Sequence, residues 1–128
     1  MKILIDTHAF FWWLTLDRRL SATVLEALED QANEVLVSAV TAWEMTTKIR
    51  LGKWPGGEAV ADDLDKTLHE YELQALPITM AHARLAGSLP GAHRDPFDRI
   101  LAAQTELEGA VLATADPAFR DFNVAVLW

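Results

Sequence analysis

Short apolar runs alternate with longer amphipathic stretches along this chain, and this alternation constrains its fold more than any other feature. The apolar runs are three or four residues long and predict β-strands at 3–5, 35–37, 75–78 (broken by Pro77), 111–113 and 124–127. Strands that are apolar at every position are buried on both faces, as in a parallel sheet covered by helices on each side. The pattern therefore predicts an α/β fold: a doubly wound α/β/α sandwich with a central parallel sheet of about five strands.

Capping residues mark the helices between these strands. Ser21, Ser38 and Thr79 are N-caps by type and position, and Asp95 followed by Pro96 is a strong helix start. Glycines at positions 52 and 109 supply helix ends. The helices predicted in this way, N-caps included, cover residues 7–16, 21–31, 38–51, 58–72, 79–88 and 95–108, and Asp116-Pro117 starts a short turn or helix.

Length and composition set the outer bounds. The 128 residues suffice for one domain, expected to span residues 1–128. The chain has no cysteine, which excludes disulfides and thiolate zinc sites. No apolar run approaches the roughly 18–20 residues of a membrane span, and the N-terminus lacks a signal-peptide layout. We expect a cytoplasmic protein that has no membrane association.

The net charge of −8, from 11 basic and 19 acidic residues, argues against a sequence-independent binder of duplex DNA. The charges are unevenly placed. Residues 58–72 carry six of the acids, as on the solvated face of a helix. Basic residues gather elsewhere, at Lys48, Arg50 and Lys53 and again at Arg94 and Arg99. A local basic surface is therefore compatible with the acidic total.

Four carboxylates fall near the expected carboxyl edge of the sheet. Asp6 directly follows the first strand, and Asp116 comes three residues after Ala113 at the end of the fourth. Glu44 lies about two turns into the helix after the second strand, and Asp98 lies in the first turn of the helix that leads to the fourth. Because ligands bind beyond the carboxyl ends of parallel strands, we expect all four side chains to face one crevice.

Carboxylates that share a crevice repel each other unless a cation neutralises them. Oxygen ligands without cysteine suit Mg²⁺, with Mn²⁺ as an alternative. Such an ion lowers the pKa of a bound water and stabilises charge on a phosphoryl group. The pattern indicates hydrolysis of a phosphodiester by water, and it makes the four carboxylates the candidate catalytic and metal-ligating residues: Asp6, Glu44, Asp98 and Asp116.

Each of these carboxylates also has a purely structural interpretation. Asp6 is placed to cap the first helix, and Asp98 to form a capping box. Glu44 is spaced for an i,i+4 ion pair with Lys48, although its apolar neighbours indicate partial burial. Asp116 precedes a proline, as residues that start turns often do. The shared position at one sheet edge, rather than any single residue, favours the functional interpretation.

Several other residues leave alternatives open. Thr114 either orients a metal-bound water or satisfies the strand end, and Asp95 is foremost an N-cap. His8 and His93 are candidate ligands or acid–base groups, but neither has a second histidine at helical spacing. The tryptophans suggest base stacking, yet core or dimer-interface positions fit better for Trp12, Trp13 and Trp43 and remain open for Trp54 and Trp128.

Four segments of the chain together form a specific pattern. They are Ile3-Leu4-Ile5-Asp6-Thr7-His8-Ala9 with Trp12-Trp13-Leu14; Ser38 with Trp43-Glu44, Lys48 and Gly52-Lys53; His93-Arg94-Asp95-Pro96-Phe97-Asp98-Arg99 with Ala102-Ala103-Gln104; and Thr114-Ala115-Asp116-Pro117-Ala118-Phe119. In this order, and over essentially the whole chain, they resemble the PIN-domain toxins of the VapC type. The combination is far more specific than any of its parts.

The resemblance implies a PIN-like fold, a Mg²⁺- or Mn²⁺-dependent endoribonuclease that acts on RNA, and a cognate VapB-type antitoxin that blocks the site. The family's acidic quartet falls on Asp6, Glu44, Asp98 and Asp116. Thr114 matches a recurrent Ser or Thr beside the last Asp, and Asp95 belongs to the motif as a supporting or capping group. The resemblance also implies a homodimer, which the apolar stretch 9–14 and the region 58–72 would suit.

Other classes fit less well. A haloacid-dehalogenase-type phosphatase needs Asp-x-Asp after the first strand, where this chain has Asp6-Thr7-His8. A receiver domain needs adjacent acids there and a late lysine, but no lysine follows Lys66. A module of the same fold that binds RNA or protein without cleaving is the remaining alternative, and the intact quartet speaks against it.

Overall fold

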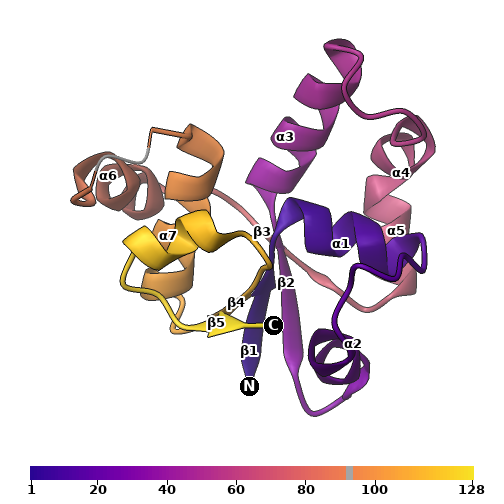
Figure 1. Ribbon diagram of the computed structural model, residues 1–128, viewed down its shortest axis with the longest axis horizontal. Helices are drawn as coiled ribbons and strands as arrows, with labels where there is room; N and C mark the ends of the chain where they lie inside the picture. Colours follow the sequence, from indigo (N-terminus) through magenta and orange to yellow (C-terminus); the bar gives the residue numbers. More distant parts are fainter. Residues whose placement is uncertain (92–93) are drawn as a thin grey trace.

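The computed structural model describes residues 1–91 and 94–128 and is built around one five-stranded sheet (Figure 1). The strands lie in the order β3-β2-β1-β4-β5, and every neighbouring pair is parallel. Their bounds are β1 Lys2–Ile5, β2 Glu34–Ser38, β3 Gln74–Leu76, β4 Val111–Ala113 and β5 Val126–Leu127. The predicted doubly wound parallel sheet is confirmed.

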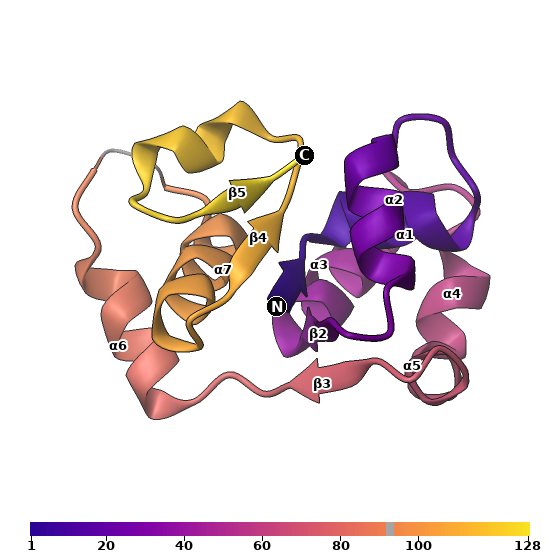
Figure 2. The same ribbon diagram turned by 90° about the horizontal axis from the view of Figure 1, so that it is seen from below.

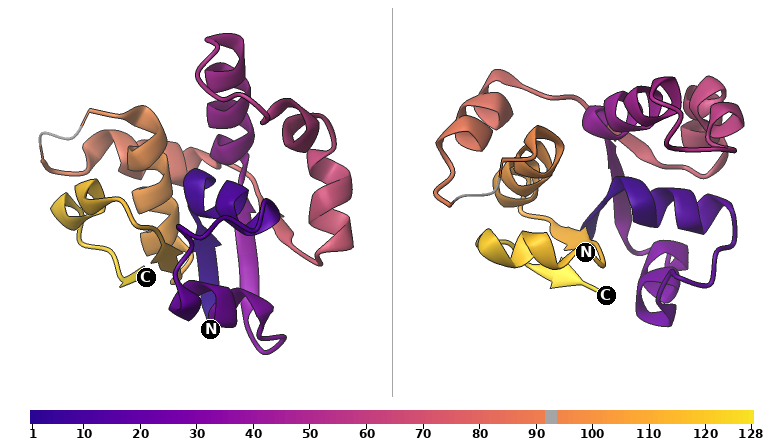
Figure 3. Two further views of the ribbon diagram at one scale, coloured as in Figure 1. Left: turned by 45° about the vertical axis from the view of Figure 1, so that its right-hand side comes forward. Right: turned by 45° about the horizontal axis from the view of Figure 1, so that its top comes forward.

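Helices cover both faces of this sheet (Figures 1 and 2). One face carries α1 (Thr7–Leu14), α2 (Ala22–Glu29), α4 (Glu58–Asp62) and α5 (Leu64–Glu70). The other carries α6 (Met80–Ser88), α7 (Pro96–Leu107) and the 3-10 helix η1 (Pro117–Asp121). The remaining helix, α3 (Ala39–Arg50), continues from β2 and rises beyond the carboxyl edge of the sheet (Figures 1 and 3).

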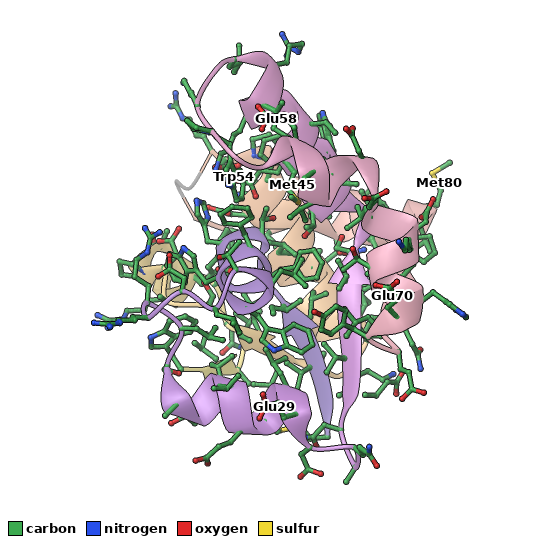
Figure 4. The ribbon with its side chains drawn as sticks, turned by 90° about the vertical axis from the view of Figure 1, so that its right-hand side faces the viewer. Glu29, Met45, Trp54, Glu58, Glu70 and Met80 are labelled. Carbon is green, nitrogen blue, oxygen red and sulfur yellow. The ribbon has the colours of Figure 1, made fainter. Side chains whose placement is uncertain are left out.

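Two apolar cores lie on opposite sides of the sheet because successive strand residues point to opposite faces. Ile3 and Ile5 pack into the core beneath α1 and α2, whereas Leu4 between them packs beneath α7 and η1. All three are completely buried. In Figure 4, Met45 of α3 lies in the interior of the first core, while Glu58 and Glu70 lie on the outer side of α4 and α5.

The single helix predicted for residues 58–72 is wrong: the segment forms two short helices that meet at Asp63. The Asp63 N–H donates to the Ala59 carbonyl at the end of α4. The Asp63 carbonyl accepts from the Thr67 N–H at the start of α5. Aspartate has low helix propensity because its side chain competes for nearby backbone groups, and the run Asp62-Asp63 favours a break. The acids of this segment are all exposed, as expected.

The ends of other elements differ from the predicted ones by one or two residues. β3 ends at Leu76, because Pro77 has no N–H to donate to a neighbouring strand. The first helix ends at Leu14 rather than residue 16, since Leu16 adopts a left-handed conformation with φ of 54°. β5 begins at Val126, two residues later than predicted. In the part of the chain that the structure describes, no helix has the length and apolar character needed to cross a membrane.

Candidate active site

The strand order reverses between β1 and β4, which places a topological switch point between two neighbouring strands in the middle of the sheet. In doubly wound sheets the ligand crevice lies at this point, beyond the carboxyl ends of the strands. Asp6 follows β1 and Thr114 follows β4, and the Asp6 N–H donates to the Ala113 carbonyl at 3.1 Å. The fold thus brings residues more than 100 positions apart to one place.

Asp6 is a buried carboxylate held by two donors. Its Oδ1 accepts from the Ala9 N–H at 2.7 Å, which makes it the N-cap of α1, and its Oδ2 accepts from the Thr114 hydroxyl. The side chain is only 6% exposed. Burial raises the pKa of Asp6, an effect that these hydrogen bonds and nearby His8 reduce and that the charge of Glu44 reinforces. The predicted capping role is confirmed, and the carboxylate is a costly buried charge as well.

Thr114 joins the two ends of the switch point. Its hydroxyl donates to Asp6 and accepts from the Asp116 N–H at 3.1 Å, and the residue is 1% exposed. Asp116 caps η1 by accepting from the Ala118 N–H at 2.9 Å, and its side chain is exposed. The hydroxyl of Thr114 therefore fixes two aspartates relative to each other.

Glu44 enters the same crevice from α3. It is 6% exposed, and its Oε2 accepts from Lys48 Nζ at 2.7 Å. The i,i+4 ion pair that the sequence allowed is present, but on a buried face of the helix rather than an exposed one. A hydrogen bond of 3.2 Å between the hydroxyls of Thr7 and Thr41 ties α3 to α1 beside it.

Asp98 and Asp95 come from the start of α7. Asp95 is the N-cap, with its Oδ1 accepting from the Phe97 N–H at 2.9 Å, and it is exposed. Asp98 lies in the first turn and is partly buried. His93, a candidate acid–base group, lies outside the described residues.

A single small pocket of about 90 Å³ gathers all four predicted carboxylates, together with Asp95. Its lining contains two basic side chains, which belong to Lys48 and His8. The sequence indicated Lys48 as an ion-pair partner of Glu44 and as one of a basic group with Arg50 and Lys53, but not as a residue that lines the carboxylate pocket. Its spacing from Glu44 was the available signal, because a cation placed one turn from a buried carboxylate also reaches the pocket that this carboxylate lines.

The donor set fits a divalent cation by chemistry and by location. The carboxylates supply the oxygen ligands that Mg²⁺ and Mn²⁺ prefer, and the cation would offset the cost of burying Asp6 beside Glu44. Over residues 1–91 and 94–128, however, no three His, Asp or Glu side chains already stand in a geometry that could hold a metal ion. Capping bonds hold Asp6 and Asp116, and Lys48 holds Glu44.

Trp13 packs against the core beneath α1, as the sequence indicated, but Trp43 does not. Trp43 is 52% exposed and meets Phe97 edge-on at 4.7 Å, so a core position for it is wrong. Trp54, which the sequence left open, is 8% exposed and belongs to the core under α1. Its neighbours in sequence are polar or turn-forming, so local apolarity gave no indication of this burial.

Comparisons with known proteins agree with the fold. A structure of VapBC2 from Rickettsia felis, bound to a DNA fragment from the promoter, superposes with a TM-score of 0.70 over 98% of this chain and 96% of that chain, at 18% identity. FitAcB from Neisseria gonorrhoeae superposes with a TM-score of 0.67 over 97% and 95%, at 22% identity. These likenesses establish a shared architecture.

Sequence comparison is more specific. The protein named Ribonuclease VapC22 from Mycobacterium tuberculosis is 29% identical over 119 residues, which are 92% of this chain and 89% of the relative. The family model described as the PIN domain matches residues 3–125, which include all four carboxylates. The chain therefore belongs to the PIN domain family.

Proposed function

We propose that this protein, a single PIN domain over residues 1–128, is the toxin of a type II toxin–antitoxin module and a divalent-metal-dependent endoribonuclease. The observation that carries the proposal is the gathering of Asp6, Glu44, Asp98 and Asp116 in one pocket at the switch point of the sheet. The relative named Ribonuclease VapC22 supports the ribonuclease activity and the toxin assignment.

We assign a separate role to each side chain of the pocket from its position. Asp6, Asp98 and Asp116 would hold Mg²⁺, or Mn²⁺, with Thr114 and Asp95 as supporting groups. When bound, such an ion lowers the pKa of a coordinated water and stabilises charge on the scissile phosphate. Glu44 either completes the ligand set or orients the attacking water. Lys48, 2.7 Å from Glu44, supplies a positive charge that draws the RNA phosphate toward an otherwise acidic pocket.

The proposed partners follow from the related structures. The Rickettsia felis structure contains VapBC2 on promoter DNA, which supports a cognate VapB-type antitoxin for this chain. A basic antitoxin segment would dock at the acidic pocket and block it. A homodimer and a cytoplasmic location, where the RNA substrate resides, complete the proposal.

Cleavage of total cellular RNA by purified, antitoxin-free protein tests the activity. We expect discrete fragments with Mg²⁺ or Mn²⁺, no fragments with EDTA, and none from Asp116→Asn. Asp121→Asn is a matched control, since Asp121 lies on η1 outside the carboxylate pocket. Fragments that persist in EDTA or in Asp116→Asn would contradict the proposed site, and folded protein without any metal-dependent cleavage would favour a binding module of the same fold.

A further inference from the structure

A second pocket lies directly beside the carboxylate pocket and shares His8 and Lys48 with it. Its volume is about 260 Å³. We call it the aromatic–basic pocket and define it by three rings and three cations: His8, Trp12, Trp54, Arg19, Lys48 and Lys53. These residues come from α1, from the loop after it, and from the end of α3 with the turn that follows. In Figure 4, Trp54 lies next to α1 below the end of α3.

One wall of the pocket is a rigid aromatic stack. The His8 ring lies on Trp54 with the centroids 5.3 Å apart and the planes only 14° from parallel. Phe11, which also lines the pocket, contacts Trp54 edge-on with a centroid distance of 4.8 Å. Trp54 is buried but His8 is exposed, so His8 presents the outer surface of an anchored stack.

The second aromatic group is Trp12, which does not pack into either apolar core. Its neighbours Phe11, Trp13 and Leu14 all pack against the core beneath α1, whereas Trp12 is absent from both cores of the described residues. It faces His8 with a centroid distance of 6.0 Å, and Trp128 meets its ring edge-on at 5.9 Å. Trp12 is half-buried and lines the pocket, so part of its ring is accessible for contact with a base.

Three cations surround these rings. The Arg19 guanidinium lies 4.8 Å from the centroid of the Trp12 ring, oriented by two hydrogen bonds to Asp17 of 3.1 and 2.8 Å. Lys48 Nζ lies 5.6 Å from the Trp54 ring, and Lys53 is exposed at the rim. Among the described residues that line this pocket, none is acidic, although Arg19 is ion-paired with Asp17 and Lys48 with Glu44 outside the lining.

We propose that the aromatic–basic pocket binds one unpaired nucleotide of the RNA, next to the phosphate that is cleaved. Aromatic faces beside lysine and arginine are the means by which proteins hold single-stranded nucleic acid, with bases stacked on rings and phosphates met by cations. Because His8 and Lys48 border both pockets, a base bound here would lie close to a phosphate at the carboxylates. This inference rests on the proposed RNA substrate and adds a base-binding site at a defined place beside the carboxylates.

Binding of short fluorescein-labelled oligoadenylate and oligouridylate, and of the duplex they form together, tests the inference by fluorescence anisotropy in Mg²⁺ at low salt. Every protein carries Asp116→Asn so that hydrolysis does not consume the probe. Neighbouring residues supply matched controls: Trp12→Leu is compared with Trp13→Leu, and Arg19→Gln with Arg18→Gln. Arg18 and Arg19 are both exposed, and Trp12 and Trp13 are both half-buried.

We expect Trp12→Leu to raise the Kd for the single strands about fivefold or more, as loss of one base-stacking contact does, and Trp13→Leu to leave it near the parent value. Arg19→Gln should lower the slope of log affinity against log salt by about 0.7, and Arg18→Gln should not. The duplex should bind more weakly than either strand.

Equal Kd values for Trp12→Leu and Trp13→Leu would overturn the inference, and so would a parent protein that binds neither strand. Failure of the proposed function is seen separately, in the protein without Asp116→Asn. If that protein cleaves RNA while the pocket variants bind like the parent, the proposed nuclease activity is supported and the proposed nucleotide-binding pocket is contradicted. If the pocket variants lose binding but no protein cleaves RNA, the proposed nucleotide-binding pocket is supported and the proposed nuclease activity is contradicted.

Discussion

At the scale of single residues, Asp6 combines a structural and a proposed catalytic task. It caps α1 through the Ala9 N–H, and burial beside Glu44 raises its pKa. A carboxylate whose pKa is raised on folding binds its proton more tightly in the folded state than in the unfolded one. Its ionisation therefore destabilises the fold: the loss sets in as the pH rises past the unfolded pKa and is complete above the raised folded pKa.

Replacement of Asp6 by Asn should consequently remove activity and raise stability together. Asn keeps an acceptor for Ala9 but carries no charge, so we expect a higher Tm than wild type at neutral pH without added metal. The difference should shrink as the pH falls and Asp6 of the wild type becomes protonated. Calorimetry across pH measures this, with Asp62→Asn on the exposed surface as control. A lower Tm for Asp6→Asn at neutral pH would contradict the account.

The role of the Thr114 hydroxyl can be tested with two substitutions that keep the size of the side chain nearly unchanged. Thr114→Val removes the donor to Asp6 and the acceptor for Asp116 N while keeping the side-chain shape. Loss of such a supporting contact typically lowers metal affinity or activity about tenfold to a hundredfold, and a buried group left unsatisfied costs about 1–3 kcal/mol of stability. Thr114→Ser retains the hydroxyl and should restore cleavage. A Thr114→Val protein as active as Thr114→Ser would assign the hydroxyl a purely structural role.

The sequence predicted the four carboxylates but not their contacts. Asp6 and Asp116 followed expected strand ends, so their meeting at one edge was foreseeable from the parallel topology. The bridge through Thr114 joins positions 108 apart and depends on which two strands are neighbours, which a single sequence does not reveal. The same holds for His8 and Trp54, whose stacking needs α1 and the turn after α3 to be packed together.

At the scale of secondary-structure elements, the start of α7 places two aspartates with different tasks. Asp95 caps the helix, and Asp98 lies one turn inside it toward the pocket. We expect Asp95→Ala to lower the free energy of unfolding by about 0.5–2 kcal/mol through the lost cap and to weaken metal-dependent cleavage without abolishing it. Asp98→Ala should abolish cleavage with the fold intact. Chemical denaturation and the RNA assay on both variants measure this, and an active Asp98→Ala protein would remove that residue from the site.

Helix positions were predictable where an N-cap residue and a terminating glycine flanked the segment, as for α3 and α7. The prediction of one helix over residues 58–72 was wrong because it rested on the charge pattern. A run of charged residues does not indicate where one short helix ends and the next begins. The capping of α6 was predicted only in part. Thr79 is the N-cap, but buried His82 completes a capping box and also pairs with Glu108 at 2.8 Å, a contact between α6 and the end of α7 that no local pattern contains.

At the scale of the whole molecule, most of the surface acids lie away from the proposed active site. The acids of α4 and α5 are exposed on the outer side of one helical layer, where they contribute to the net charge of −8 without lining the carboxylate pocket. The sheet edge instead brings together an acidic pocket and, beside it, a pocket lined by rings and cations. An acidic protein can therefore present a local surface suited to RNA.

The location of a bound divalent ion is the most direct test of this account. A crystal structure of the protein soaked with Mn²⁺, with anomalous diffraction data, measures it independently of any RNA substrate. We expect an anomalous peak in the pocket lined by Asp6, Glu44, Asp98 and Asp116, and no peak there in crystals of Asp98→Asn. An empty pocket at saturating Mn²⁺, or a peak elsewhere on the molecule only, would contradict the proposed metal centre.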